Sequence, residues 1–200
     1  MLELLIATKN TGKIREIEKL LADLPIAVRS LKEFGNVVEP EEIGADFAEN
    51  AVLKARYYAG KTGLSALADD SGLEVEALGG APGVFSARYA GIIASDEEKI
   101  FKLLDELEQT SDDERRARFV CVIAIADKNG EIRCLEEGIC RGKIARKPTG
   151  ANGFGYDPIF IPDGFSETFG GLSDEIKQKI SHRARAALKI IGFLRDFIVV

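Results

Sequence analysis

The chain has 200 residues, of which 33 are acidic and 27 basic, and its formal net charge at pH 7 is -6. A hydrophobic content of 46% with only 6 prolines is typical of a globular protein and excludes a disordered or collagen-like chain. The negative charge disfavours wholesale binding to nucleic acid or to an anionic membrane, because both need a basic surface. We therefore expect a small-molecule partner, with no nucleic-acid and no membrane partner.

The cysteine and histidine content limits the kinds of site that the chain can form. Cys121, Cys134 and Cys140 are odd in number and lack C-x-x-C spacing, which indicates reduced thiols in a cytosol. His182 is the single histidine, so a histidine-rich zinc site is excluded and a metal would be a hard cation such as Mg2+. No signal peptide and no apolar run of the roughly 18 residues that span a membrane are seen, so we expect a cytoplasmic protein.

Short apolar runs alternate with helix-periodic segments over the first third of the chain. The elements expected there are a strand at 2–7, a helix at 14–24, a strand at 26–30 and a helix at 47–60. Asp46 resembles an N-cap of the last helix, on which Asn50 and Lys54, four residues apart, share one face.

The same alternation continues through the rest of the chain. The elements expected there are a strand at 65–68, a turn at 69–72, a strand at 73–77, a helix capped by Ser95, strands at 119–126 and 132–144 joined by a hairpin, a short strand at 159–161 and a helix from about 173 onward. The turn at 69–72 is predicted because Asp-Asp-Ser-Gly interrupts the apolar pattern. Alternating helices and strands with a hairpin indicate an α/β protein around a mixed sheet.

Residues 8–13 lie where a predicted strand is followed by a helix, and they concentrate polar donors. Their hydroxyl, amide and ammonium groups, together with the unpaired N–H groups of the helix, suit a bound phosphate. The alternative is a capped helix with solvated lysines. The segment is not a Walker A loop.

Two acidic pairs, Glu41–Glu42 and Asp69–Asp70, are predicted on separate loops. Carboxylates from two loops can share one Mg2+, which takes the rest of its ligands from water and from substrate phosphates. The alternatives are solvated acids at 41 and 42, and an Asx turn at 69–72. The second pair follows a buried run, where charge must be paired or metal-bound.

A glycine-rich loop, G-A-N-G-F-G-Y-D-P, occupies residues 150–158. Its glycines allow close approach of the backbone to a ligand, and Phe154 and Tyr156 offer flat faces on which a base can stack. The spacing is not a dinucleotide fingerprint, and the alternative is a turn that buries two aromatic rings. Lys177 and the triplet Ser-His-Arg at 181–183 add further donor groups.

Taken together and in order, these motifs resemble the inosine triphosphate pyrophosphatase family, whose bacterial members are called XTP/dITP diphosphatases. The matching segments are TKNTGK at 8–13, EE at 41–42, ENAVLKA at 49–55, ADDSGLEV at 68–75, GGAPGVFSARYAG at 79–91, GFGYDPIF at 153–160 and SHRARAAL at 181–188. The match extends from residue 4 to about residue 190. The joint pattern is far more specific than any one segment.

The resemblance implies a fold, an assembly and a reaction. The fold is a single domain over 1–200, with an elongated central mixed sheet flanked by helices in two lobes and an active-site cleft between them, and the assembly is a homodimer. The reaction is Mg2+-dependent hydrolysis of ITP, dITP and XTP to the monophosphate and pyrophosphate, which keeps these nucleotides out of DNA and RNA.

The resemblance also implies roles for individual residues. Asp70 is the proton acceptor, and Glu41 and Asp70 hold the metal. The residues implied to bind the substrate are Thr8, Lys9, Asn10, Thr11, Gly12, Lys13, Lys54, Ser71, Phe154, Gly155, Tyr156, Asp157, Lys177, His182 and Arg183. Arg88 and Asp69 are supporting candidates.

Elementary chemistry agrees with this reading. Cleavage of a phosphoanhydride depends mainly on positioning and on stabilisation of charge, which lysines, helix N–H groups and Mg2+ supply. Hypoxanthine and xanthine present an acceptor at O6 where adenine presents a donor, so backbone N–H groups or donors from His182 and Arg183 favour the deaminated bases. Two other functions fit the residues less fully: a non-catalytic nucleotide-binding module, and a pyrophosphatase for pyrimidine or modified nucleotides.

Overall fold

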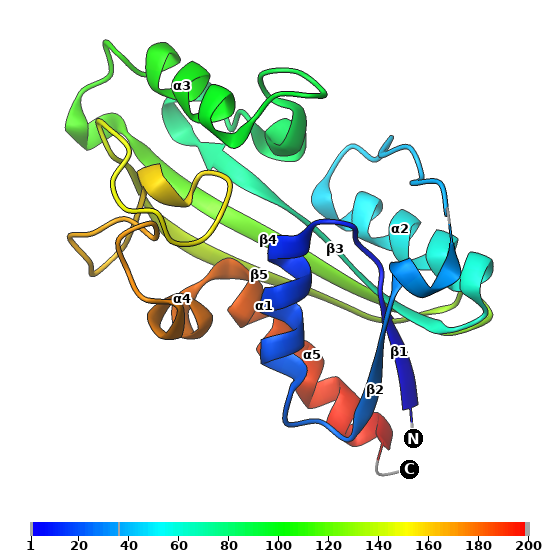
Figure 1. The fold of residues 1–200 in the computed structure, drawn as a ribbon. Coiled ribbons are helices and arrows are strands. Elements are labelled where there is room, and N and C mark those ends of the chain that lie inside the picture. The colour runs from blue at the N-terminus through cyan, green and yellow to red at the C-terminus, as the bar shows by residue number, and fades with distance from the viewer. Residues whose placement is uncertain (1, 36, 199–200) are drawn as a thin grey trace. The chain divides into compact units, whose positions relative to one another are not determined.

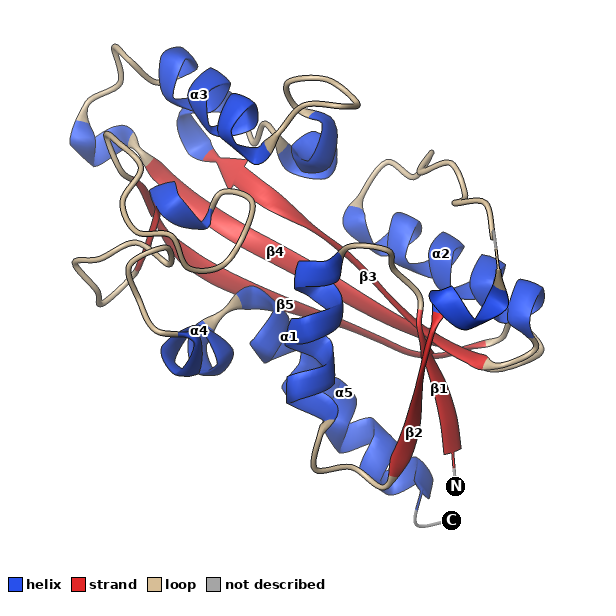
Figure 2. Cartoon of the chain, viewed as in Figure 1, coloured by secondary structure: helices blue, strands red, loops and turns tan. Residues whose placement is uncertain are grey.

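A computed structural model describes residues 2–35 and 37–198 of the chain. Figure 1 shows the path of the chain, and Figure 2 shows its helices and strands. Six strands form one sheet in the order β2-β1-β3-β4-β5-β6. β1 is parallel to both β2 and β3, whereas β5 and β6 are antiparallel. The predicted α/β class with a mixed sheet is therefore confirmed.

The strands and helices follow the predicted order closely. The strands are β1 (Leu2–Ile6), β2 (Ile26–Ser30), β3 (Ser65–Val75), β4 (Arg116–Ala126), β5 (Ile132–Ile144) and β6 (Phe160–Pro162). The α-helices are α1 (Thr11–Leu21), α2 (Phe47–Thr62), α3 (Asp96–Glu106), α4 (Asp174–Ile180) and α5 (His182–Ile198). One helix was expected from about residue 173, but Ser181 has an extended backbone and separates α4 from α5.

The predicted turn at 69–72 is wrong, because β3 continues without a break from Ser65 to Val75. Charged residues end a strand when they must reach water, but here Asp69 and Asp70 are buried beside cationic partners from neighbouring helices. Successive side chains of a strand point to opposite faces, so each aspartate finds its own partner without any turn of the backbone.

The chain divides into two compact units. The first unit contains residues 1–70, 121–138 and 183–200, and the second contains 71–120 and 139–182. β3, β4 and β5 each contribute residues to both units.

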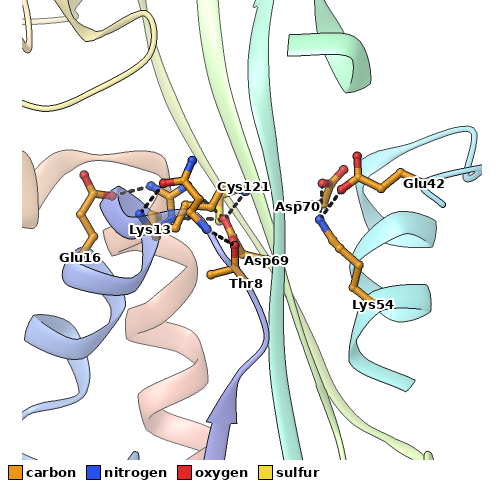
Figure 3. Close-up of polar contacts among 10 residues, drawn as sticks. Thr8, Lys13, Glu16, Glu42, Lys54, Asp69, Asp70 and Cys121 are labelled. Carbon is orange, nitrogen blue, oxygen red and sulfur yellow. Dashed lines mark hydrogen bonds and ion pairs between the residues drawn. The ribbon is translucent and has the colours of Figure 1, made fainter. Parts of the chain in front are cut away.

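The core of the first unit is formed by apolar side chains of β1, α1, β3, β4 and α5. Leu4, Ile17, Leu67, Ile123 and Ile190 are typical members, and each is at least nine-tenths buried. α1 and α5 cover one face of this part of the sheet, and α2 lies on the other face (Figure 3). The helical spacing of the apolar residues in α1 and α5 therefore buries one stripe of each helix against the strands.

The core of the second unit is richer in aromatic residues. Phe119, Phe160 and Phe169 pack around one another, with ring centroids 4.6 to 6.4 Å apart. α3 adds Ile100 and Leu103 to this core, and the expected capping box at Ser95 and Glu98 begins the helix. This capped, apolar-striped helix therefore has the structural role that its sequence predicts.

The three cysteines are free thiols, as expected. Among the described helices, none has both the length and the apolar character that crossing a membrane requires.

Candidate active site

The turn between β1 and α1 begins the helix as predicted. Asn10 is the N-cap of α1, and its Oδ1 accepts a hydrogen bond from the N–H of Lys13 at 3.1 Å. The N–H of Asn10 in turn donates to Oγ1 of Thr8 at 3.2 Å. Lys9, Asn10 and Thr11 are exposed. The turn thus combines a helix N-terminus with exposed polar side chains, which is the arrangement expected of an anion site.

Lys13 extends from the first turn of α1 toward β3. Its Nζ lies 3.2 Å from Oδ2 of Asp69, and only 15% of its side chain is exposed. Lys13 is therefore paired with a buried carboxylate, unlike the solvated lysine that was the alternative interpretation of this turn.

Asp69 is the centre of a buried ionic cluster on the α1 and α5 side of β3 (Figure 3). Its Oδ2 accepts hydrogen bonds from Nη2 of Arg183 at 3.0 Å and from Nε at 3.2 Å. Nη1 of Arg183 bonds to Glu16 on α1. Burial raises the pKa of the Asp69 carboxyl, but Lys13 and Arg183 outweigh burial and hold that pKa well below its usual range. Asp69 is therefore ionised and links α1, β3 and α5.

Asp70 points to the opposite face of β3, toward α2 (Figure 3). Its Oδ1 accepts a hydrogen bond from Nζ of Lys54 at 2.6 Å, and the same Nζ donates to Oε1 of Glu42 at 2.9 Å. Burial raises the pKa of the Asp70 carboxyl above its usual range, although Lys54 and Lys13 act against it. A carboxylate that is more basic than usual is suited to accept a proton from water.

Lys54 keeps its charge in this pair. Burial lowers the pKa of its ammonium group, but the carboxylates of Asp70, Asp69 and Glu42 outweigh burial and raise that pKa. A cation fixed beside Asp70 is placed to stabilise the negative charge of a phosphate.

Glu41, which was predicted to hold the metal, is exposed in the loop before α2. Its neighbour Glu42 makes the contact with Lys54. The metal role of Glu41 stays a prediction. Glu42 lies in the candidate site, although the sequence identified it only as a member of the acidic pair Glu41–Glu42.

The carboxylate oxygens of Asp70 and of the acidic loop fit Mg2+ as metal ligands. Among residues 2–35 and 37–198, no three His, Cys, Asp or Glu side chains gather as a metal site. Mg2+, however, takes only one or two carboxylates from a protein and completes its shell with water and phosphates. Asp70 and Glu42 already share one cationic group, the ammonium of Lys54. The acidic loop and Asp70 therefore present the hard oxygen ligands that Mg2+ prefers.

The second unit contains the glycine-rich loop, which is held by the carboxylate of Asp157. Oδ2 of Asp157 accepts from the N–H of Phe154 at 2.7 Å and from Nζ of Lys177 at 2.5 Å. The same Nζ lies 4.8 Å from the ring centroid of Phe154, in a cation–π contact. A Cβ on Gly153 would lie 2.0 Å from Oδ2 of Asp157, so only glycine fits there. Lys177 and Asp157 thus fix the conformation of the loop.

Asp96 is a further anchor of this loop that the sequence did not reveal. Its Oδ2 accepts from the N–H of Gly155 at 2.8 Å, and its Oδ1 lies 2.6 Å from Nζ of Lys99. Asp96 and Gly155 are 59 residues apart, so no local pattern connects them.

The predicted rings of the second unit differ in their burial. Tyr156 is 5% exposed and its hydroxyl donates to the carbonyl of Ser86 at 3.0 Å, so its ring does not offer the free stacking face that we expected. Phe154 is the half-buried aromatic residue of the loop. The ring of His182 is also buried and stacks on Phe119 with centroids 4.6 Å apart.

Ser71 and Arg88 are the other predicted residues of the second unit. Ser71 follows Asp70 on β3, at the first residue of the second unit. Arg88 ends a short 3-10 helix, and its guanidinium lies 5.1 Å from the ring centroid of Phe85. Their contacts with a substrate stay predictions.

Comparison with known proteins decides the family. The model of the Ham1 family matches residues 4–193, which is nearly the whole chain. The chain belongs to the Ham1 family.

Relatives are similar to this Ham1-family chain over nearly the whole of its length. A protein of Coxiella burnetii named dITP/XTP pyrophosphatase is 46% identical over 201 residues, which cover all of both chains. A protein of the same name from Desulforamulus reducens is 49% identical over 193 residues, covering 96% of each chain. The resemblance noted in the sequence is therefore confirmed at the level of the family.

Solved structures of the Ham1 family share the fold. A HAM1 protein from Coxiella burnetii superposes with a TM-score of 0.89 at 46% identity, covering 98% of this chain and all of the other. The Ham1 protein of Staphylococcus aureus gives a TM-score of 0.86 at 43% identity, covering 97% and 98%.

Proposed function

We propose that this Ham1-family protein hydrolyses the deaminated purine nucleoside triphosphates ITP, dITP and XTP to the monophosphate and pyrophosphate. The proposal is supported by relatives named dITP/XTP pyrophosphatase at 46% to 51% identity over nearly the whole chain. Removal of these nucleotides would prevent their incorporation into DNA and RNA. The observation that carries the proposal is the ion pair of Asp70 with Lys54, a buried carboxylate with a fixed cation 2.6 Å from its Oδ1.

In this proposal the turn of residues 8–13 and Lys54 bind the triphosphate. The polar turn of residues 8–13 donates backbone and side-chain hydrogen bonds to phosphate oxygens, and Lys54 adds a fixed positive charge. The first N–H groups of α1 have no hydrogen-bond partner within the helix. They can therefore donate directly to the phosphate oxygens.

Asp70 and the acidic loop that carries Glu41 and Glu42 would hold Mg2+. When bound, Mg2+ neutralises charge on the phosphates and polarises a nearby water. Asp70 accepts the proton as this water attacks a phosphorus atom of the α–β anhydride. The bridging bond breaks, one product leaves as pyrophosphate and the other as the nucleoside monophosphate.

The glycine-rich loop of the second unit would recognise the base. Phe154 supplies a half-buried ring for stacking, and the loop is held rigidly by Asp157, Lys177 and Asp96. Backbone N–H groups, or donors from His182 and Arg183, would favour bases with an oxygen at position 6. Adenine would leave such donors unpaired, at a cost of about 1 to 3 kcal/mol each.

The assembly and location that accompany this function are also proposals. The family resemblance supports a homodimer, and three free thiols are in keeping with a cytoplasmic protein. A chromatographic mass of twice 21.8 kDa would support the dimer, and a mass of 21.8 kDa would contradict it.

The proposed reaction is tested by its products. Incubation of the purified protein with ITP and Mg2+ should release IMP and pyrophosphate. Release of IDP and inorganic phosphate would show that a bond other than the proposed α–β anhydride is cleaved. An absence of turnover with ITP, dITP and XTP would overturn the proposal.

A further inference from the structure

Asn50 is a buried polar residue of α2 that the proposed reaction does not use. It lies in the first turns of the helix, and its exposed fraction is 0%. Its Oδ1 accepts a hydrogen bond from the N–H of Gly44 at 2.8 Å. Asn50 therefore connects α2 to the backbone of the acidic loop, residues 41–44, which contains Glu41 and Glu42.

The orientation of the Asn50 amide is fixed by this contact. An N–H group can only donate, so the atom facing Gly44 must be the oxygen. Nδ2 consequently points elsewhere, and among the described residues it has no hydrogen-bond partner. A buried donor without a partner destabilises the folded state. An apolar side chain at residue 50 would avoid this cost. The benefit of an asparagine at this position is therefore its hydrogen bond to the acidic loop.

Gly44 lies so close to α2 that a larger residue does not fit. A Cβ on Gly44 would be 2.7 Å from Oδ1 of Asn50, 2.8 Å from Cβ of Glu49 and 2.9 Å from the backbone nitrogen of Asn50. Two of these atoms cannot move aside without moving the helix itself. The absence of a side chain at residue 44 thus permits the hydrogen bond to form.

Lys54 holds the same loop at a second point. It lies one helical turn after Asn50, and its Nζ bonds to Glu42 of the loop and to Asp70 of β3. One face of α2 therefore holds both the backbone of the acidic loop and one of its carboxylates.

We propose that Asn50 and Gly44 are positioning residues that hold the acidic loop against α2 and thereby set the affinity of the site for its divalent cation. This inference rests on the proposed function, because that function assigns the cation to Asp70 and the acidic loop. Residues that orient metal ligands from outside the coordination shell commonly change metal affinity by 10- to 100-fold.

The test measures cation binding directly, with Mn2+ as the probe in an electron paramagnetic resonance titration of the full chain. Asn50→Leu keeps a similar volume but removes the acceptor, and Gly44→Ala inserts a methyl group between loop and helix. Each variant should raise the Kd for Mn2+ about tenfold or more. Gly60→Ala is the matched control, because Gly60 is also a residue of α2 and a Cβ there meets no atom within 4 Å.

A second measurement separates positioning from general damage. The Mg2+ concentration for half-maximal pyrophosphate release should rise in both variants more than the KM for ITP, while the circular dichroism spectrum stays that of the wild type. If Asn50→Leu does not fold, Gly44→Ala in the loop still gives the answer.

The two proposals fail in different ways. Wild-type Mn2+ affinity in folded Gly44→Ala or Asn50→Leu overturns the positioning role, whether or not the enzyme is active. A wild-type protein that does not bind Mn2+ overturns it as well. A protein that binds Mn2+ but releases no pyrophosphate from ITP overturns the proposed function and leaves the Mn2+ result standing on its own.

Discussion

Asp69 and Asp70 are consecutive residues of β3, and their carboxylates lie on opposite faces of the strand (Figure 3). Asp69 is enclosed by Lys13 and Arg183, whereas Asp70 meets Lys54. The pKa of Asp69 is lowered and that of Asp70 is raised. The two aspartates therefore differ in their surroundings: Asp69 ties α1, β3 and α5 together, and Asp70 is the one that the proposed function uses as proton acceptor.

The first prediction concerns Asp70. Asp70→Asn should lower the turnover of ITP by about 10²- to 10⁴-fold, because an amide cannot accept the proton of the attacking water. The fold should be retained, since the amide oxygen can still accept from Lys54. Pyrophosphate release and circular dichroism measure the two effects, and near-normal turnover would remove Asp70 from its catalytic role.

The second prediction concerns Asp69. Asp69→Asn should lower the free energy of unfolding by about 3 kcal/mol, because it leaves the buried charges of Lys13 and Arg183 poorly compensated. Urea unfolding gives this value. Asp163→Asn is the control, since Asp163 forms an exposed pair with Arg116 at 3.1 Å and exposed pairs contribute little. Equal free energies of unfolding for the two variants would contradict the conclusion that the buried cluster at Asp69 stabilises the fold more than the exposed pair at Asp163.

β3 shows where prediction from the sequence fails. Asp-Asp-Ser-Gly has the composition of a turn, and the strand continues because Lys13, Lys54 and Arg183 neutralise the two aspartates. These partners come from three helices, and lie 16 to 114 residues away from the aspartates in the sequence. Local patterns cannot predict such pairs, because the pairs depend on the tertiary fold.

Patterns within one element were predicted well. The strand at 26–30 is observed with the expected bounds, and Asp46 caps α2 by accepting from the N–H of Glu49 at 2.8 Å. Asn50 and Lys54 share the predicted face of α2. Spacing along a helix fixes which side chains are neighbours, so these features follow from the sequence alone.

Long-range contacts of the candidate site could not be predicted. Asp96 bonds to the glycine-rich loop across 59 residues, and Glu16 bonds to Arg183 across 167. Tyr156 was expected either to stack on a base or to be buried by the turn, and its ring is part of the core. Burial of an aromatic residue in a glycine-rich loop depends on what packs against that loop.

The third prediction compares two glycines of the loop. Gly153→Ala should strongly raise the KM for ITP, because its Cβ would lie 2.0 Å from Oδ2 of Asp157 and disturb the contacts of that carboxylate. Gly155→Ala meets no atom within 4 Å and carries only the strain of its positive φ, about 1 to 2 kcal/mol. Steady-state kinetics of the two variants measure the difference, and a larger effect at residue 155 would contradict this description of the loop.

The fourth prediction concerns Phe154. Phe154→Ala should raise the KM for ITP by about 5- to 150-fold, because stacking of a base on an aromatic ring contributes about 1 to 3 kcal/mol. The turnover number should change much less, since the proposed function gives Phe154 a role in binding the base and none in proton transfer. Phe101→Ala is the control, because Phe101 is 74% exposed on α3. An unchanged KM in Phe154→Ala would exclude stacking on this ring.

The central claim is that the chain cleaves deaminated purine nucleoside triphosphates between the α and β phosphates. The most direct measurement is pyrophosphate release from ITP, dITP and XTP, compared with ATP and GTP, at equal concentration and in the presence of Mg2+. We predict rapid release of pyrophosphate from the three deaminated nucleotides, little from ATP, and none from any of them after Mg2+ is chelated. Equal rates with ATP and ITP, or release of inorganic phosphate in place of pyrophosphate, would contradict the account.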